Sequence, residues 1–175
     1  MTYKTNIIIK FLFIAVIMSN SLYGQRKSKE ALGNSIVESI LNNDLNSFKS
    51  LLLPKEVALK YQENNDLDNS DKEVPDSLMA QYEAAYHQVV IPRYEKNFQE
   101  IVSLNQANSI DWSNLNFIIL YKASSKGEEY IPYFIHTKLN NTDFNHFYFG
   151  AVRYNGKWYL SGNLEITKDE KYAPK

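Results

Sequence analysis

The stretch AVRYNGKWYLSG, Ala151–Gly162, places the dipeptide Asn155-Gly156 between two runs of large apolar side chains. A two-residue type I′ turn requires a positive φ at both central residues, and Asn-Gly adopts that conformation at little cost. The stretch therefore predicts a tight β-hairpin. Because successive side chains in a strand point to opposite faces, both faces of this hairpin carry aromatic residues and both need a cover.

The period-2 alternation of apolar residues extends upstream from this hairpin. Polar residues at 124–129 and 140–143 interrupt the alternation. Short connections of this kind join antiparallel neighbours, so the carboxyl-terminal part of the chain is expected to form a four-stranded meander. The predicted strands are 115–123, 130–139, 144–154 and 157–164.

The amino-terminal part of the chain shows helical spacing of its apolar residues instead. Short helices are predicted to begin at Ser28, after Asp44 as an N-cap, and near Val57. The run 64–73 is rich in Asn and Asp and predicts an exposed loop. This run is too short to separate two domains.

A longer helix is expected from Asp76 or Ser77 to about Asn108. Pro92 lies in its middle, where the missing N–H and the restriction on the preceding residue predict a kink or a break. Together these patterns predict an α+β fold. In this fold, N-terminal helices, one of them long and kinked near Pro92, pack on a curved four-stranded antiparallel meander sheet.

The first residues of the chain differ from the rest. Lys4 precedes the apolar run 11–18, which small and polar residues follow. This order is typical of a secretory signal peptide at 1–24, and the apolar run is short for a bilayer span. An uncleaved anchor helix is the alternative. The remainder is expected to be a single domain, 25–166, followed by a disordered tail at 167–175. The signal peptide predicts that the protein is periplasmic or secreted.

The charge and the cysteine content narrow the possible partners. The chain contains no cysteine and has a formal net charge of −1 at pH 7. Loss of Lys4 and Lys10 with the signal peptide makes the mature chain more acidic, so no basic surface for nucleic acid is expected. Since no disulfide can form, packing must stabilise the fold.

The hairpin register predicts which strand residues share a face. If Tyr154 opposes Lys157 and the other turns are simple hairpins, one face becomes the core face. That face carries Phe117, Ile119, Tyr121, Phe134, Phe147, Phe149, Ala151, Trp158 and Leu160. The opposite face is more apolar than a face meant only for water. Its candidate ligand-binding or interface residues are Tyr133, Ile135, Tyr148, Tyr154 and Tyr159.

Tyrosine suits a surface where an aromatic body is buried and a hydroxyl stays wet. We therefore expect this second face to be covered by an N-terminal helix or by a second subunit, which gives a homodimer through the sheet. A small apolar or aromatic ligand is the alternative cover. No membrane span is expected after signal cleavage.

The short helices around NNDLNSFKSLLLP (42–54), the long helix and the curved sheet ending in YNGKWYLSG (154–162) resemble the NTF2-like and cystatin-like superfamily, in particular its small exported members of Bacteroidetes type. The resemblance covers residues 30–165. A typical member has a strand or hairpin before its last helix, where this chain has the polar run 64–73. Superfamily members include pocket enzymes, dimeric binding modules and accessory domains. The resemblance carries no catalytic residue over to this chain.

The three histidines give weak metal signals. Glu83 and His87 lie four residues apart on the long helix, and an ion pair is favoured over half of a metal site. His136 and His146 point to opposite faces in the register above, and a one-residue shift at 140–143 would place them opposite each other. No metal site and no cofactor are therefore predicted.

His146 and Tyr148 are the candidate catalytic residues. With Asp143 nearby in the sequence, His146 could accept a proton while the aspartate orients its ring. Aspartate at a turn more often caps its own backbone. No nucleophile elbow, P-loop or dinucleotide-binding glycine pattern is present. The sequence therefore favours an exported, non-catalytic binding or protein-interaction module. The alternative is a small pocket enzyme of the isomerase or dehydratase type that uses His146 with nearby tyrosines.

Overall fold

The computed structural model describes residues 27–66, 75–122, 131–141 and 144–168. The predicted signal peptide at 1–24 lies outside the described residues. Of the predicted tail at 167–175, the residues from 169 onward also lie outside the described residues. Thr167 is the last residue of a strand.

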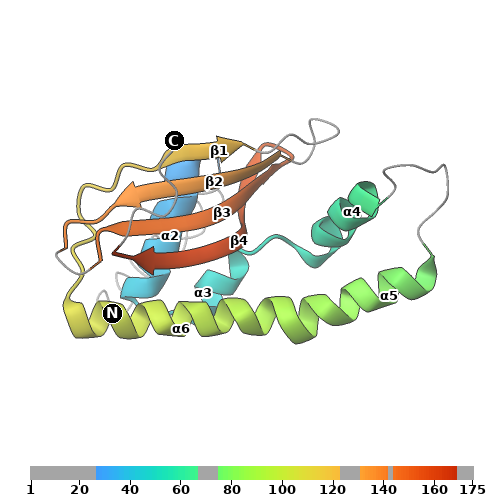
Figure 1. Cartoon of the computed structure of the whole chain (residues 1–175), viewed down its shortest axis with the longest axis horizontal. Helices are drawn as coiled ribbons and strands as arrows, with labels where there is room; N and C mark the ends of the chain where they lie inside the picture. Colours follow the sequence, from blue (N-terminus) through green and yellow to red (C-terminus); the bar gives the residue numbers. More distant parts are fainter. Residues whose placement is uncertain (1–26, 67–74, 123–130, 142–143, 169–175) are drawn as a thin grey trace, which may run out of the picture.

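The strands form one antiparallel sheet in the order β1-β2-β3-β4, with helices before them in the chain (Figure 1). Asn155 and Gly156 have φ values of 48° and 72°, and Tyr154 pairs with Lys157. The predicted hairpin, the meander and the α+β class are confirmed. The strands are β1 Ile118–Lys122, β2 Ile131–Lys138, β3 His146–Tyr154 and β4 Lys157–Thr167.

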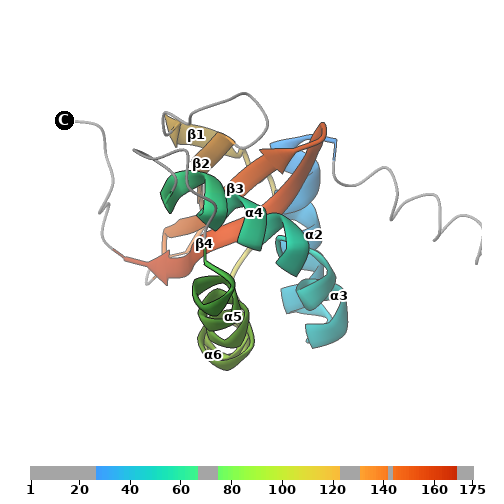
Figure 2. The ribbon, with the colours of Figure 1, turned by 90° about the vertical axis from the view of Figure 1, so that its right-hand side faces the viewer.

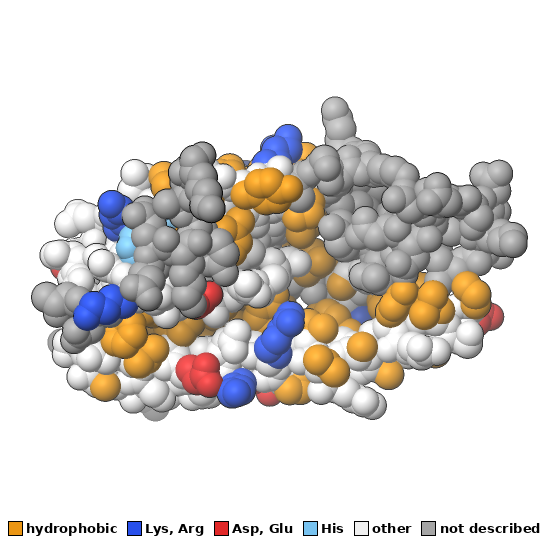
Figure 3. Space-filling model, in the orientation of Figure 1, with side chains coloured by type: hydrophobic (Ala, Val, Ile, Leu, Met, Phe, Trp, Pro, Cys, Tyr) orange, Lys and Arg blue, Asp and Glu red, His pale blue; other side chains and the backbone are white. Residues whose placement is uncertain are grey.

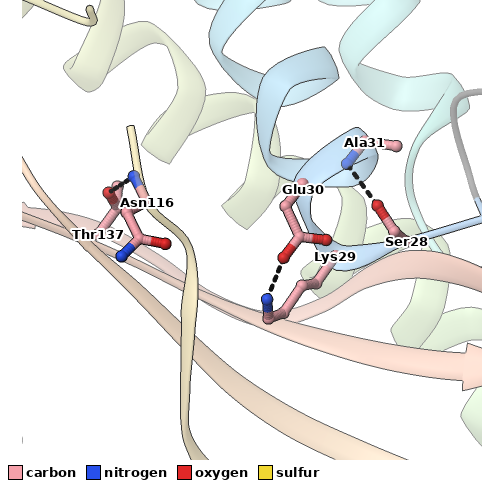
Figure 4. A network of polar contacts seen from close by, with 6 residues as sticks. All are labelled: Ser28, Lys29, Glu30, Ala31, Asn116 and Thr137. Carbon is pink, nitrogen blue, oxygen red and sulfur yellow. Dashed lines mark hydrogen bonds and ion pairs between the residues drawn. The ribbon is translucent and has the colours of Figure 1, made fainter. Parts of the chain in front are cut away.

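The short helices begin where capping side chains stand. The Ser28 hydroxyl accepts the Ala31 N–H (Figure 4). The Asp44 carboxylate accepts the Ser47 N–H, so each side chain satisfies a backbone donor that a helix start leaves open. The helices are α2 Lys29–Leu41, α3 Leu45–Ser50 and α4 Lys55–Asp66. The loop predicted from residue 64 thus starts too early, because α4 continues to Asp66.

The long helix is built from α5 Asp76–Ala85, a π-helical turn η1 Tyr86–Val90, and α6 Ile91–Asn108. It begins at Asp76, one of the two predicted starts, but its N-cap residue is Pro75, so neither Asp76 nor Ser77 caps it. The wide turn replaces the break expected at Pro92: the Ile91 N–H donates to the Tyr86 carbonyl, five residues back. A proline ring clashes with the carbonyl four residues before it, and the wider turn relieves that clash while the helix continues (Figure 1).

Helix α2 packs on one face of the sheet and runs behind it in Figure 1. Gly33 allows α2 to approach Phe117 closely, because a Cβ atom at Gly33 would lie 2.5 Å from the Phe117 ring. Beside this contact, the Asn116 N–H donates to the Thr137 hydroxyl at 3.1 Å and ties the entry of β1 to β2 (Figure 4). The largest fully buried members of this core include Leu32, Ile36, Ile40, Phe48, Phe98, Phe147, Phe149 and Leu160.

The register between β2 and β3 corrects the predicted faces. Ile135 pairs with Phe149 and Tyr133 with Ala151, so Ile135 and Tyr133 lie on the α2 side and not with Tyr148. The connection spans residues 139–145, closed by the Leu139 N–H on the Asn145 carbonyl, and is longer than the 140–143 turn assumed above. Because a strand alternates faces at each residue, this shift exchanges the faces of β2 relative to β3.

Residues expected on the core face move in the same way. Phe134 lies on the outer face, where its ring stacks on Tyr148 at 5.7 Å. Tyr121 pairs with Phe134 after a bulge in β1 and is 63% exposed. Ile119 pairs with Ile135 before the bulge and stays on the α2 side, where it is 42% exposed. A bulge adds one residue to a strand and reverses the alternation beyond it.

Helix α4 covers part of the outer face (Figure 2). Leu53 and Val57 pack there against Val152 and Tyr159, with Tyr154 at the edge of the same cluster. One of the covers expected for the tyrosine-rich face, an N-terminal helix, is therefore present over Tyr159 and Tyr154.

The contact between Gly33 and Phe117 can be tested with Gly33→Ala. Alanine stabilises a helix by about 0.8–1.0 kcal/mol relative to glycine, but overpacking a full core costs about 1–3 kcal/mol. We expect a net fall of about 1 kcal/mol in the free energy of unfolding, measured by urea denaturation. Asn34→Ala at the exposed neighbouring position is the control and should be neutral or slightly stabilising. A stabilised Gly33→Ala variant would show that the ring moves aside freely.

Candidate functional site

A cavity of about 280 Å³ lies between α4, the π-helical turn and β4. Most of its lining is aliphatic, and hydrophobic side chains gather between the sheet and the long helix in Figure 3. Its size is near the lower limit of the roughly 300–1,000 Å³ range of small-molecule pockets. The described lining residues are Leu52, Leu53, Ala58, Tyr86, Val90, Ile91, Arg93, Tyr94, Leu160, Ser161 and Gly162.

The segment between α3 and α4 forms one wall of this cavity. Leu52 makes a parallel bridge to Leu160: the Leu53 N–H donates to the Leu160 carbonyl, and the Leu160 N–H donates to the Leu51 carbonyl. The Tyr86 hydroxyl donates to the Leu53 carbonyl at 2.8 Å. The π-helical turn is thereby joined to the edge of the sheet.

A bulge in β4 forms the opposite wall. The β3–β4 register shifts between Phe149 and Ala151, and Gly162 has φ +107°. A Cβ atom on Gly150 would lie 2.2 Å from the Ser161 carbonyl, so only glycine permits this crossing. The bulge leaves the Gly162 N–H outside the ladder, and it donates to the Tyr94 hydroxyl of α6.

The two tyrosines of the cavity stay neutral well into the alkaline range. Burial raises the pKa of Tyr94, which the Gly162 hydrogen bond only partly opposes. Burial also raises the pKa of Tyr86, and the nearby Glu56 adds to that effect. A neutral phenol keeps its hydrogen and acts as a donor.

The charges near the cavity are few. Glu83 pairs with Lys55 at 2.7 Å, and the Lys55 hydrogen bond is the main reason that the pKa of Glu83 is lowered, with His87 a minor cause. The ion pair that Glu83 forms is therefore with Lys55, and the predicted pair with His87 stays a prediction. The Arg93 guanidinium carbon lies 5.8 Å from the centre of the Tyr94 ring. Across the described ranges, no group of three or more His, Cys, Asp or Glu side chains is placed to hold a metal ion.

The predicted catalytic residues lie elsewhere, on the outer face. His136 and His146 point to the same face, so the prediction of opposite faces is wrong: His136 pairs with Tyr148, and His146 pairs with Lys138. The His136 Nε2 and His146 Nδ1 atoms are 3.0 Å apart, and both rings stack with Tyr148. Asp143, the third member of the predicted relay, lies outside the described residues.

The outer-face cluster of His136, His146, Tyr148 and Phe134 has the character of packing. His146 is 5% exposed and Tyr148 is fully buried. Neither lines the cavity described above, nor a second one of about 310 Å³ beside α6 and β4 that Glu100 and Glu165 border. The structure therefore separates the predicted catalytic pair from the cavity.

The surface available for a dimer through the sheet is smaller than the sequence predicts, because α4 packs on Tyr159 and Tyr154. Exposed apolar side chains remain on β1, where Ile118 is 44% and Tyr121 is 63% exposed. The dimer stays a prediction.

Sequence reasoning missed the cavity residues of the long helix, Tyr86, Val90, Arg93 and Tyr94. Pro92 within a helical pattern was the available signal, because a proline inside a helix displaces the turn before it. The pattern does not show that this turn faces α4 and β4.

Comparison with models of protein families, with curated protein sequences and with solved structures gave no match for this chain. Among the described residues, no helix combines the length and the apolar character that crossing a membrane requires.

The hydrogen bond from Gly162 to Tyr94 can be measured with Tyr94→Phe. Its loss should lower the free energy of unfolding by about 0.5–1.5 kcal/mol at neutral pH. Because burial raises the pKa of Tyr94, the unfolded chain releases this proton first, and wild-type stability should fall as pH rises above about 10. The variant should show a shallower fall in urea denaturation between pH 9 and 11. Tyr121→Phe, at an exposed position, should not change neutral stability.

The histidine pair can be tested by a double-mutant cycle. His136→Phe and His146→Phe each leave the partner nitrogen without this hydrogen bond, at a cost of about 1–3 kcal/mol. The double variant removes both polar groups, so its free energy of unfolding should fall by less than the sum of the two single-variant losses. The difference, which is the coupling energy, should be about 0.5–3 kcal/mol in urea denaturation. If the losses in free energy of unfolding of the two single variants simply add in the double variant, the two histidine rings do not form a hydrogen bond.

Proposed function

We propose that this chain is an exported, non-catalytic binding module that takes a small, mainly apolar ligand in the cavity between α4, the π-helical turn and β4. The observation that carries this proposal is the cavity itself: six of its eleven described lining residues are aliphatic, namely Leu52, Leu53, Ala58, Val90, Ile91 and Leu160. A cavity with an apolar lining and a few polar groups is the usual form of a small-molecule site.

The lining supports binding more than catalysis. No described lining residue is a histidine, a carboxylic acid or a cysteine, so none of them offers a general base at neutral pH. Tyr86 and Tyr94 are held neutral by burial. The enzyme alternative, with His146 and Tyr148 as acid and base, has less support because both side chains are packed into a ring stack away from the cavity.

Two sequence features support the rest of the proposal. The order of basic, apolar and small polar residues in 1–24 supports export. The resemblance to the NTF2-like and cystatin-like superfamily supports a binding role, since that superfamily contains binding modules. Neither feature identifies the ligand.

The test is binding of the neutral fluorescent dye N-phenyl-1-naphthylamine to the chain produced in an exporting host. Val90 lines the cavity and is half-buried, so Val90→Phe should fill the space and weaken dye binding at least tenfold, or about 1.4 kcal/mol. Val89→Phe is the matched control, because Val89 is 58% exposed on the same turn and does not line the cavity. Equal dye binding by wild type and Val90→Phe, with both folded, would contradict the proposal.

A further inference from the structure

One positively charged side chain belongs to the described lining of the cavity. Arg93 is the only charged residue among the described lining residues, and its guanidinium lies over the Tyr94 ring. Within the described ranges, no carboxylate forms an ion pair with it. A guanidinium carries five N–H donors in one plane. These donors match the geometry of a ligand carboxylate.

A second donor, the Tyr94 hydroxyl, belongs to another residue of the same cavity lining. The Tyr94 oxygen accepts the Gly162 N–H, so the hydroxyl hydrogen is left to be donated. The Tyr94 side chain is 4% exposed, and burial raises its pKa, which keeps that hydrogen in place. A buried neutral donor and a cation in the same cavity lining together favour an anionic oxygen over a neutral one.

Two of the three acids near this end of the cavity are held in ion pairs. Glu83 is held by Lys55 at 2.7 Å. Glu56 acts on Tyr86 in the opposite direction to Lys55. Glu95, two residues after Arg93, is held by Lys49 at 2.6 Å. Among the described lining residues, Arg93 supplies the charge that a ligand would contact.

We infer that the cavity takes a short amphiphilic carboxylate, with its apolar chain among Leu52, Val90 and Leu160 and its carboxylate on Arg93 and the Tyr94 hydroxyl. This inference rests on the proposed function and names its ligand class. The cavity volume of about 280 Å³ favours a short chain. An Arg–carboxylate contact is frequently bidentate, which fixes the orientation of the ligand as well as its charge.

The experiment compares octanoate with 1-octanol, which share an apolar chain and differ in the charged head. Each displaces N-phenyl-1-naphthylamine from the wild-type chain, and the displacement gives its Kd. We expect octanoate to bind about tenfold more tightly than 1-octanol. Arg93→Gln removes the charge, so the Kd of octanoate should rise to about that of 1-octanol. The Kd of 1-octanol should not change.

Lys96→Gln is the matched control, because it removes the same charge from the same helix at a position that is 75% exposed and does not line the cavity. It should keep the tenfold preference. Equal binding of octanoate and 1-octanol to wild type, or an unchanged preference in Arg93→Gln, would overturn the carboxylate inference and leave the proposed function standing. If the dye and both ligands fail to bind, the proposed function and this inference fall together.

Discussion

The close crossing of β3 and β4 at Gly150 is the constraint on which the rest of the structure depends. A Cβ atom on Gly150 would lie 2.2 Å from the Ser161 carbonyl oxygen, so the bend in β4 requires glycine at this position. The bend releases the Gly162 N–H to Tyr94 of α6. On the near side of the bend, Leu160 remains in the ladder and also bonds the Leu51–Leu53 segment. The close contact between Gly150 and the Ser161 carbonyl thus brings two segments to the same edge of the sheet, namely the long helix and the segment before α4.

The two faces of the sheet are covered in different ways. On one face, α2 comes close because Gly33 leaves room for the Phe117 ring, and a large core forms with α6. On the other face, α4 covers the end that carries Val152 and Tyr159. The histidine and aromatic cluster around Tyr148 occupies another part of this face, where the rings stack on one another. The aromatic richness of the hairpin is therefore explained in large part by covers that belong to the chain itself.

The proposed binding site follows from the same arrangement. Pro92 cannot continue an ordinary helical turn, and the π-helical turn before it places Tyr86 and Val90 toward α4 and β4. The Tyr86 hydroxyl then holds the Leu53 carbonyl, which keeps the wall of the cavity in place. A backbone irregularity that arises from one proline is thereby stabilised by a tertiary hydrogen bond, and the cavity with Arg93 in its lining lies beside it.

By itself, the sequence determined the features that depend on neighbours along the chain: the Asn155-Gly156 hairpin, the helix starts at Ser28 and Asp44, the end of the long helix at Asn108, and the α+β class. These are local, because turn and cap geometry depend on a few consecutive residues. Only the tertiary structure decided the faces of β2, since a connection longer than expected reversed the alternation and brought His136 to His146. The cavity was also a tertiary outcome, because its walls come from three segments whose contacts no local pattern encodes.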